Sequence, residues 1–321
     1  MKIVFLDSRT LGYEIDVSGL SRFGEAVVYD FVSDDEVGDV ISDADIIITN
    51  QNRLGKSNLG AADGLKLICA AATGYDNIDT AYCRERGIGV TNVPGYAAAS
   101  VAQHTFSMLF YLISHSAYYD DYVKSGSFSR EEFAVHSGRD FFELDGKTWG
   151  IIGMGQIGQK VAAYAECFGC EVVYYSTTGQ NRQERYRSVP LEELLKTGDI
   201  VSIHAPLNDK TRYLLEMEQL LLMKSTAYLL NLGRGGIVRE SDLAEAIENG
   251  LIAGAGLDVF ETESLPEESP LLKLKNQDRL FLTPHSAYGS AEARNRLMRT
   301  VCRNIEAFLA GHTVCGRAQT T

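Results

Sequence analysis

The stretch Thr148-Trp-Gly-Ile-Ile-Gly-Met-Gly-Gln-Ile-Gly158 decides the fold. Its apolar run, Trp149 to Ile152, predicts a buried strand that leads directly into the glycines. Beyond them, apolar residues at helical spacing predict a helix that Gly169 ends, and Glu171 to Ser176 predicts a second strand. Strand, G-x-G-x-x-G, helix and strand together are the dinucleotide-binding fingerprint in its proper context. The sequence therefore predicts a dinucleotide-binding domain.

The three glycines of the fingerprint have separate physical roles. Gly153 permits the tight turn, Gly155 lets a pyrophosphate approach the backbone, and Gly158 lets helix and strand pack closely. The helix that follows offers N–H groups and positive potential to the phosphates. A lone G-x-G-x-x-G is often only a flexible loop, but the flanking strands and helix argue against that interpretation here.

Length and composition indicate two domains and no nucleic-acid or membrane partner. The 321 residues are enough for two domains that each bury a core. A net charge of −13 disfavours contacts with nucleic-acid phosphates, and an anionic substrate would need a placed cation to capture it. No apolar run is long enough to cross a bilayer, and Met1 to Asp7 predicts a strand rather than a signal peptide. We therefore expect a cytoplasmic protein.

The cysteines form no disulfide-like framework, which agrees with a reducing compartment. Cys167-Phe-Gly-Cys170 matches the C-x-x-C redox motif. The pair falls where the first helix of the nucleotide domain ends, and small buried residues are expected there. Structural packing is therefore favoured over a redox role. The other cysteines are Cys69, Cys83, Cys302 and Cys315.

Short apolar segments alternate with helical patterns on both sides of the fingerprint. Strands this apolar suit parallel sheets that are covered on both faces. The alternation predicts an α/β fold with two Rossmann-like, doubly wound parallel-sheet domains and a cleft between them. Besides the strands of the fingerprint, the predicted strands are 2–7, 26–29, 44–50, 65–70, 89–93, 199–204, 227–232, 252–260 and 279–283.

Two predicted helices that do not alternate with strands indicate the domain boundaries. Ser100 is expected to cap a long helix that runs to about Ser114. The last helix, Ala291 to Leu309, has no strand to partner and is expected to pack back on the first domain. We therefore expect a discontinuous substrate domain, 1–98 plus 287–321, and a dinucleotide-binding domain, 99–286.

Residues 117–147 are aromatic and charged and have no clear period. They could form an arm that packs on a partner subunit, or merely a surface excursion. His136 lies in this segment, and we expect no chemical role for it.

Motifs along essentially the whole chain resemble those of the D-isomer-specific 2-hydroxyacid dehydrogenase family. The run Ser100-Val-Ala-Gln-His-Thr105, together with the aromatic Tyr288 just after the last motif histidine, His285, is most similar to the glycerate dehydrogenase or hydroxypyruvate reductase branch. The resemblance implies an NAD(P)-dependent homodimer that interconverts a small 2-keto acid, hydroxypyruvate-like or glyoxylate-like, and its D-2-hydroxy acid by hydride transfer. The remaining motifs, besides the fingerprint, are Ala72-Thr-Gly-Tyr-Asp-Asn-Ile-Asp79, Ser202-Ile-His-Ala-Pro-Leu207, Met223-Lys224, Asn231-Leu-Gly-Arg-Gly-Gly236, Gly256-Leu-Asp-Val-Phe-Glu261 and Thr283-Pro-His-Ser-Ala-Tyr288.

Three residues would carry this reaction. Arg234 follows a strand in a glycine-flanked turn, where a guanidinium can grip a carboxylate in a bidentate fork; the alternative is an ordinary surface arginine. His285 ends another strand and can donate a proton to a carbonyl oxygen; the alternative is a structural histidine at a hinge. The family pairs this histidine with Glu263, whose carboxylate stabilises the protonated ring and fixes its orientation. A solvated acidic loop that includes Glu261 is the alternative for Glu263.

The resemblance also implies binding positions for both ligands. The Thr73-Gly74 loop would offer backbone N–H groups to the substrate carboxylate, opposite Arg234, and Asn50 and Gln51 would line the same cleft. Asp258 would accept a hydrogen bond from the nicotinamide carboxamide. The other cofactor positions are Gln156 and Ile157 at the pyrophosphate, the turn of His204 and Pro206 at the adenosine end, and Leu232 beside Arg234.

One departure leaves the choice between NAD and NADP open. The fingerprint expects an acidic residue at the end of the second strand to bind the ribose 2′-OH, and Ser176 stands there. The hydroxyls of Ser176, Thr177 and Thr178 could bind a free ribose, while Arg182 is close enough in sequence to meet a 2′-phosphate. Tyr288 is a second departure, because this branch often has tryptophan there.

The remaining histidines are predicted to be structural. His104 and His115 lie on the predicted long helix, and His312 is near a polar C-terminus. None of them forms a metal cluster with cysteines or acids, so we expect no zinc mechanism. The alternative to an enzyme is a cofactor-sensing regulator of the corepressor type on the same fold.

Overall fold

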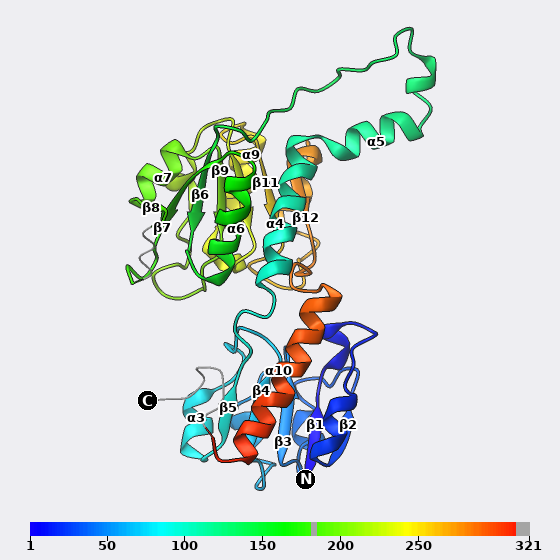
Figure 1. Cartoon of the computed structure of the whole chain (residues 1–321), viewed down its shortest axis with the longest axis vertical. Helices are drawn as coiled ribbons and strands as arrows, with labels where there is room; N and C mark the ends of the chain where they lie inside the picture. Colours follow the sequence, from blue (N-terminus) through cyan, green and yellow to red (C-terminus); the bar gives the residue numbers. More distant parts are fainter. Residues whose placement is uncertain (181–184, 313–321) are drawn as a thin grey trace. The chain divides into compact units, whose positions relative to one another are not determined.

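The computed structural model describes residues 1–180 and 185–312. The chain divides into two compact units, which are described separately (Figure 1). Unit 1 contains Met1–Ala97 and Tyr288–Thr321, and unit 2 contains Ala98–Ala287. Arg182 and Cys315, which the sequence raised as a phosphate contact and a free thiol, lie outside the described residues.

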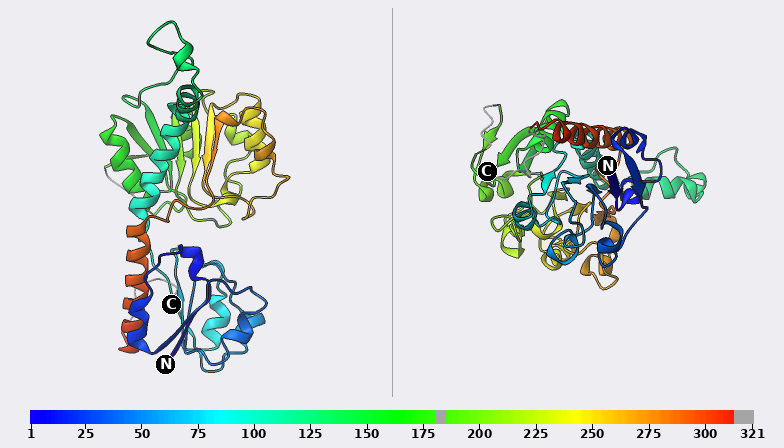
Figure 2. Two further views of the ribbon diagram at one scale, coloured as in Figure 1. Left: turned by 90° about the vertical axis from the view of Figure 1, so that its right-hand side faces the viewer. Right: turned by 90° about the horizontal axis from the view of Figure 1, so that it is seen from below.

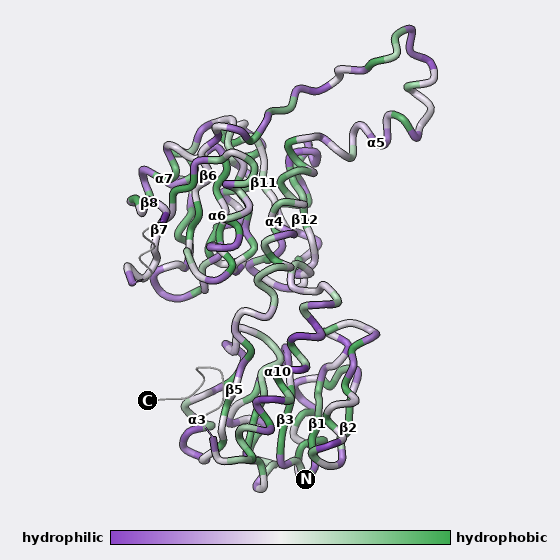
Figure 3. The backbone as a smooth tube through the Cα atoms, in the orientation of Figure 1, coloured by the Kyte–Doolittle hydropathy of each residue, from purple (hydrophilic) through white to green (hydrophobic). Residues whose placement is uncertain are grey.

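Unit 1 is built on a five-stranded sheet in the order β2-β1-β3-β4-β5, in which all neighbours are parallel. The strands in the middle of this sheet are fully buried, as their continuous apolar sequences predict. Figure 3 shows β1 and β3 as hydrophobic stretches inside the unit. The strands are β1 (Lys2–Phe5), β2 (Glu25–Val28), β3 (Ile46–Thr49), β4 (Leu67–Ala70) and β5 (Gly89–Thr91).

Helix α10 (Ala291–Leu309) belongs to unit 1, as the sequence predicts. It packs on β4 and on η2 (Ser18–Phe23), and it buries a face that includes Leu297 and Val301. Ser290 caps its first turn by accepting a hydrogen bond from the Ala293 N–H at 3.2 Å. The other helices of the unit are η1 (Ser8–Leu11), α1 (Val37–Val40), α2 (Lys56–Leu59) and α3 (Thr80–Glu85).

Unit 2 has a seven-stranded parallel sheet in the order β12-β11-β10-β9-β6-β7-β8. The strand order reverses between β6 (Thr148–Ile152) and β9 (Ile200–Ile203), so the carboxyl ends of these two strands mark the place where such sheets bind ligands. The remaining strands are β7 (Glu171–Tyr175), β8 (Arg187–Ser188), β10 (Tyr228–Asn231), β11 (Gly254–Leu257) and β12 (Leu280–Leu282).

Helices cover both faces of this sheet (Figure 2). On one face, α4 (Ala98–Ile113) packs on α6 (Gln156–Cys167) and on β10, β11 and β12. The apolar core on the other face includes residues of α7 (Leu191–Thr197), α8 (Met217–Leu220) and α9 (Glu240–Glu248). The short helices of the unit are η3 (Phe128–Arg130), η4 (Gly235–Ile237), η5 (Pro270–Lys273) and η6 (Gln277–Arg279).

Two predictions about α4 were wrong. Ser100 does not cap the helix, because α4 begins at Ala98 and the Ser100 hydroxyl donates instead to the Ala287 carbonyl at 2.6 Å. His115 does not lie on the helix either. It has a left-handed backbone with φ of 48° between α4 and α5 (Ser116–Lys124), where the chain changes direction.

The segment that follows α4 contains a helix, which the sequence did not predict. Helix α5 buries none of its residues, and both α5 and η3 extend away from the sheet of unit 2 (Figure 1). The large apolar side chains of Phe133, Val135 and Phe141 farther along the segment are about two-thirds or more exposed. His136 is held locally, by the Tyr118 hydroxyl at 2.8 Å and by Glu131.

Candidate active site

The fingerprint glycines in unit 2 fit the roles that the sequence assigns to them. Gly153 has φ of +95°, and a Cβ there would lie 2.9 Å from the Ala205 nitrogen. A Cβ on Gly158 would lie 2.2 Å from the Gly153 carbonyl oxygen, so helix α6 and its turn require glycine at that contact. Gly155 instead faces open space, with no atom within 4 Å of a Cβ position. This turn, at the first turn of a twelve-residue helix, has the shape and the N–H groups that a pyrophosphate needs.

His204 lies under this turn and is buried. Its Nε2 lies 3.1 Å from the Ser202 hydroxyl oxygen, which also accepts a hydrogen bond from Trp149 Nε1 at 2.9 Å. Burial lowers the pKa of His204 to about 3, so the ring is neutral at physiological pH. The structural role that the sequence assigns to its side chain agrees with this environment. Pro206 follows, and its carbonyl accepts a hydrogen bond from Thr211 Oγ1 at 2.7 Å.

Arg234 follows β10 in a tightly packed turn. Asn231 Oδ1 accepts from the Gly233 N–H at 3.1 Å, and Asn231 Nδ2 donates to the Arg234 carbonyl at 2.9 Å, so one asparagine fixes both sides of the turn. A Cβ on Gly235 would lie 1.8 Å from the Phe260 carbonyl oxygen, which explains the glycine after the arginine. The Arg234 side chain is half-buried. Its Nη1 donates to the Gly233 carbonyl at 3.0 Å.

The side chains of His285 and Glu263 form a hydrogen-bonded pair. Nδ1 of His285 lies 2.7 Å from Oε2 of Glu263, and both side chains are a little over one-third exposed. Glu261, the competing acid, is engaged elsewhere, because its carboxylate accepts from the Glu240 N–H at 2.6 Å and from the Tyr213 hydroxyl at 3.1 Å. The structure therefore brings Glu263 to the histidine and leaves Glu261 in a separate contact.

Asp258 organises the turn that carries His285, a role that the sequence did not reveal. Asp258 as a whole residue is 2% exposed. Its carboxylate accepts hydrogen bonds from Thr283 Oγ1 at 2.6 Å, the Ser286 N–H at 2.8 Å and the Ala287 N–H at 3.0 Å. Its backbone carbonyl accepts from the His285 N–H at 2.9 Å. Asp258 is 25 positions from Thr283 in the sequence, so no local pattern indicates this role.

His104 adds to the same group of side chains. Its Nε2 lies 3.1 Å from the Thr283 hydroxyl oxygen and 3.9 Å from Oδ1 of Asp258. His104 therefore has a structural role, as predicted, because it joins α4 to the turn that contains His285.

The end of β7 has hydroxyls rather than a carboxylate. Ser176 Oγ accepts from the Gly179 N–H at 3.0 Å, and Thr178 Oγ1 accepts from the Gln180 N–H at 3.2 Å. These bonds make a compact turn. The arginines that follow within the described residues are paired with acids, Arg185 with Glu166 and Arg187 with Glu193.

In unit 1, the predicted substrate residues follow β3 and β4. Thr73 is exposed and Gly74 half-buried. Asn50 and Gln51 form a turn whose N–H groups donate to the carboxylate of Asp7, at 2.9 Å and 2.6 Å. Burial raises the pKa of Asp7. Tyr288 donates its hydroxyl to the Thr10 carbonyl at 2.6 Å.

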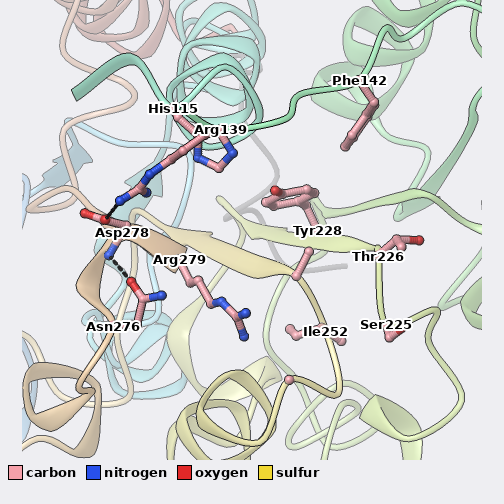
Figure 4. A pocket seen from close by; sticks show the side chains of 12 residues that line it. His115, Arg139, Phe142, Ser225, Thr226, Tyr228, Ile252, Asn276, Asp278 and Arg279 are labelled. Atoms are coloured by element: carbon pink, nitrogen blue, oxygen red, sulfur yellow. Dashed lines mark hydrogen bonds and ion pairs between the residues drawn. The ribbon is translucent and has the colours of Figure 1, made fainter. Parts of the chain in front are cut away.

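Other features of unit 2 lie apart from these residues. A cavity of about 430 Å³ opens at the amino ends of β10 and β11, and Figure 4 shows Arg139 paired with Asp278 beside it. Of the C-x-x-C pair, Cys170 is buried, with its pKa raised to about 11, but Cys167 is exposed, contrary to the predicted burial. Among the described residues, no three His, Cys, Asp or Glu side chains are grouped to hold a metal, and no helix could span a membrane.

Comparison with known proteins decides the family. The model of the D-isomer specific 2-hydroxyacid dehydrogenase NAD binding domain matches residues 106–287. This chain belongs to the D-isomer-specific 2-hydroxyacid dehydrogenase family. The predictions of the family, of an NAD(P)-dependent oxidoreductase and of two parallel α/β domains are confirmed.

Three known proteins are similar to this chain over nearly its whole length. Hydroxypyruvate reductase of Blautia hydrogenotrophica is 35% identical over 320 residues, 98% of each chain. The structure of D-lactate dehydrogenase from Aquifex aeolicus, complexed with NAD and lactic acid, is 30% identical with a TM-score of 0.81 over 96% of each chain. An acyclic imino acid reductase in complex with NADPH and D-Arg is 30% identical with a TM-score of 0.87, covering 98% of this chain and 99% of that one.

Proposed function

We propose that this dehydrogenase reduces a small 2-keto acid, such as hydroxypyruvate or glyoxylate, to its D-2-hydroxy acid. The observation that carries the proposal is the contact of 2.7 Å between His285 and Glu263, because it places an oriented imidazole on the turn that follows β12 of the cofactor-binding sheet. A bound reduced nicotinamide supplies the hydride. The hydroxypyruvate reductase relative supports the choice of substrate class.

His285 is the general acid in this proposal. With Nδ1 bonded to Glu263, Nε2 on the opposite side of the ring is the atom that exchanges a proton with the substrate oxygen. Glu263 fixes the orientation of the ring through this contact. In the oxidative direction, the neutral ring takes the proton back.

Arg234 and the Thr73–Gly74 turn bind the substrate carboxylate. A guanidinium offers a planar pair of N–H donors to the two carboxylate oxygens. The turn offers backbone N–H groups at the end of β4. Because the chain has a net charge of −13, such local donors are needed to capture an anion, and Asn50 and Gln51 at the end of β3 would line the substrate site.

The cofactor-binding residues lie at the carboxyl ends of the strands of unit 2. We assign the pyrophosphate to Gly153, Gly155, Gln156, Ile157 and Gly158, and the adenosine end to Ser176, His204 and Pro206. Leu232, Arg234 and Asp258 would line the nicotinamide end. Residues 99–286 thus form the dinucleotide-binding domain, and 1–98 with 287–321 form the substrate domain. Without an acid at Ser176, both NAD and NADP fit the hydroxyls of this turn.

We further propose a homodimer that is cytoplasmic and binds no nucleic acid. The segment that contains α5 and η3 supports the dimer. It exposes the large apolar side chains of Phe133, Val135 and Phe141, and burying them against a second copy of the chain would be favourable. Deletion of residues 128–141 should convert the dimer to a monomer in analytical ultracentrifugation. A dimer that survives the deletion would remove the segment from the interface.

A substrate screen tests the proposed function. Purified protein is mixed with NADH or NADPH and with hydroxypyruvate, glyoxylate, pyruvate or a bulkier 2-keto acid, and cofactor oxidation is followed. We expect turnover with hydroxypyruvate or glyoxylate. Tight binding of the cofactor with no turnover of any keto acid would instead support a cofactor-sensing regulator.

A further inference from the structure

The turn at Thr73 and Gly74 is anchored by a buried asparagine. Asn92 follows β5 and is 5% exposed, and its Nδ2 donates to the Thr73 carbonyl at 2.6 Å. The Thr73 hydroxyl donates to the Val93 carbonyl at 3.1 Å, and the Val93 N–H donates to the Ala72 carbonyl at 2.8 Å. Three hydrogen bonds thus tie the turn to the residues that follow β5.

A second buried asparagine continues this contact into α10. Asn304 is 1% exposed, and its Nδ2 donates to the backbone carbonyl of Asn92 at 3.2 Å. The Oδ1 atoms of both asparagines have no hydrogen-bond partner within the described residues. Each side chain therefore contributes through its Nδ2 group, in the order Asn304, Asn92, Thr73.

The hydrogen bond from Asn92 to the Thr73 carbonyl also fixes the direction of the Gly74 N–H, because both groups belong to one peptide unit. The carbonyl of Thr73 and the N–H of Gly74 belong to one planar, trans peptide unit and point in opposite directions. Because the carbonyl points toward buried Asn92, the N–H points away from it. In the described part of the chain, this N–H donates to no backbone carbonyl. A hydrogen bond accepted by the carbonyl also polarises the unit and strengthens its N–H as a donor.

We propose that Asn92, supported by Asn304, is a positioning residue that aims the Gly74 N–H at the substrate carboxylate. The inference rests on the proposed function, in which the Thr73–Gly74 turn binds that carboxylate. Neither asparagine touches the substrate; both act through the peptide unit. A donor held in place before the substrate arrives needs no reorganisation on binding.

The test replaces Asn92 with leucine, which keeps a similar volume and removes the Nδ2 donor. The measurements are the KM for glyoxylate, kcat at saturating glyoxylate and the Kd of the reduced cofactor. We expect KM to rise about tenfold or more, because a hydrogen bond to a charged group is misaligned. The Kd of the cofactor should not change, and kcat should change much less than KM.

Asn58→Leu is the matched control. Asn58 is also a buried asparagine of unit 1, and its Nδ2 donates to the Arg53 carbonyl at 2.8 Å, away from the Thr73–Gly74 turn. A general loss of stability would therefore appear in both variants, but only Asn92→Leu should raise KM. Asn304→Leu should raise KM in the same direction by a smaller factor.

Asn92→Asp supplies a rescue that a purely structural role would not give. A buried carboxyl tends to be protonated at mildly acidic pH, and its O–H can then donate to the Thr73 carbonyl. Relative to wild type at each pH, the KM of this variant should fall as the pH is lowered. The same comparison serves if Asn92→Leu does not fold.

The outcomes separate the two proposals. A folded Asn92→Leu enzyme with the KM of wild type would overturn the inference and leave the proposed function intact. The inference would also be overturned if the ratio of the KM of Asn92→Asp to the KM of wild type did not change with pH. A wild-type protein that reduces no 2-keto acid would overturn the proposed function, and the role of Asn92 with it.

Discussion

Asp258 and His285 are joined through the backbone: the His285 N–H donates to the Asp258 carbonyl at 2.9 Å, while the Asp258 carboxylate holds the residues on either side of the histidine. The proton donor that we propose therefore sits on a turn whose shape depends on one buried carboxylate. An isosteric substitution of Asp258 should therefore change the rate of the reaction without changing a contact of the imidazole ring of His285.

Asp258→Asn should lower both stability and kcat. An amide keeps one acceptor oxygen but turns an N–H₂ group toward the Ala287 N–H, and an unsatisfied buried donor costs about 1–3 kcal/mol. Urea denaturation and steady-state kinetics measure the two effects. Asp278→Asn is the control, because Asp278 is a partly exposed partner of Arg139, and it should change neither kcat nor KM. A wild-type kcat in Asp258→Asn would contradict the role of the turn.

Glu263→Gln should lower kcat for keto-acid reduction and leave the Kd of the reduced cofactor unchanged. The Glu263 carboxylate lies 2.7 Å from Nδ1 of His285 and fixes the orientation of the ring, and the amide weakens that contact. Steady-state kinetics with glyoxylate and titration of the cofactor measure the two effects. Glu261→Gln is the matched control and should change kcat much less, because Glu261 contacts Glu240 and Tyr213 instead. A Glu263→Gln enzyme with the kcat of wild type would contradict the role of this contact.

Arg234→Lys should raise the KM of the keto acid about tenfold or more, because an ammonium cannot form the bidentate contact and a hydrogen bond to a charged group is worth about 1.5–3 kcal/mol. The backbone of the turn should keep its shape, because the Asn231 side chain bonds to main-chain atoms of Gly233 and Arg234, which the substitution does not change. Kinetics with glyoxylate, together with fluorescence titration of the cofactor, would separate the two ligands. An unchanged KM would mean that the carboxylate is bound elsewhere.

Because of His204, the free energy of unfolding should be smaller in mild acid than at neutral pH. Its pKa is about 3 in the folded protein and about 6.5 when unfolded, so the unfolded chain binds an extra proton as the pH falls below 6.5. The contribution to the free energy of unfolding falls by up to about 1.4 kcal/mol per pH unit in that range. Urea denaturation at pH 7 and pH 5 should show a smaller acid loss for His204→Gln than for wild type. Equal losses would mean that His204 does not titrate in this way.

Much of the fold could be predicted because its signals are local. The strand before Gly153 and the helix that Gly169 ends follow from apolar periodicity and from the position of the glycines. Ser100 was mistaken for a cap because the helix begins earlier, at Ala98, and its hydroxyl bonds to a residue far along the chain. Helix α5 buries none of its residues, so no packing against the core of the unit marks it as a helix.

The supporting residues of the site were harder to predict than the reactive ones. Arg234 and His285 follow strands, and that position is visible in the sequence. The contacts of Asp258 with the His285 turn, and of Asn92 with Thr73, join residues about twenty or more positions apart. Such contacts depend on the order of strands in the sheet, which a single sequence does not contain.

The reaction of His285→Ala tests the central claim most directly. Wild type and variant are each mixed with reduced cofactor and with glyoxylate or hydroxypyruvate, and a single turnover is followed after the Kd of the cofactor has been measured. We predict that the variant binds the cofactor as wild type does and reduces the keto acid at least about a hundredfold more slowly, the loss expected for a missing general acid. A variant that reduces the keto acid at the wild-type rate would contradict the account.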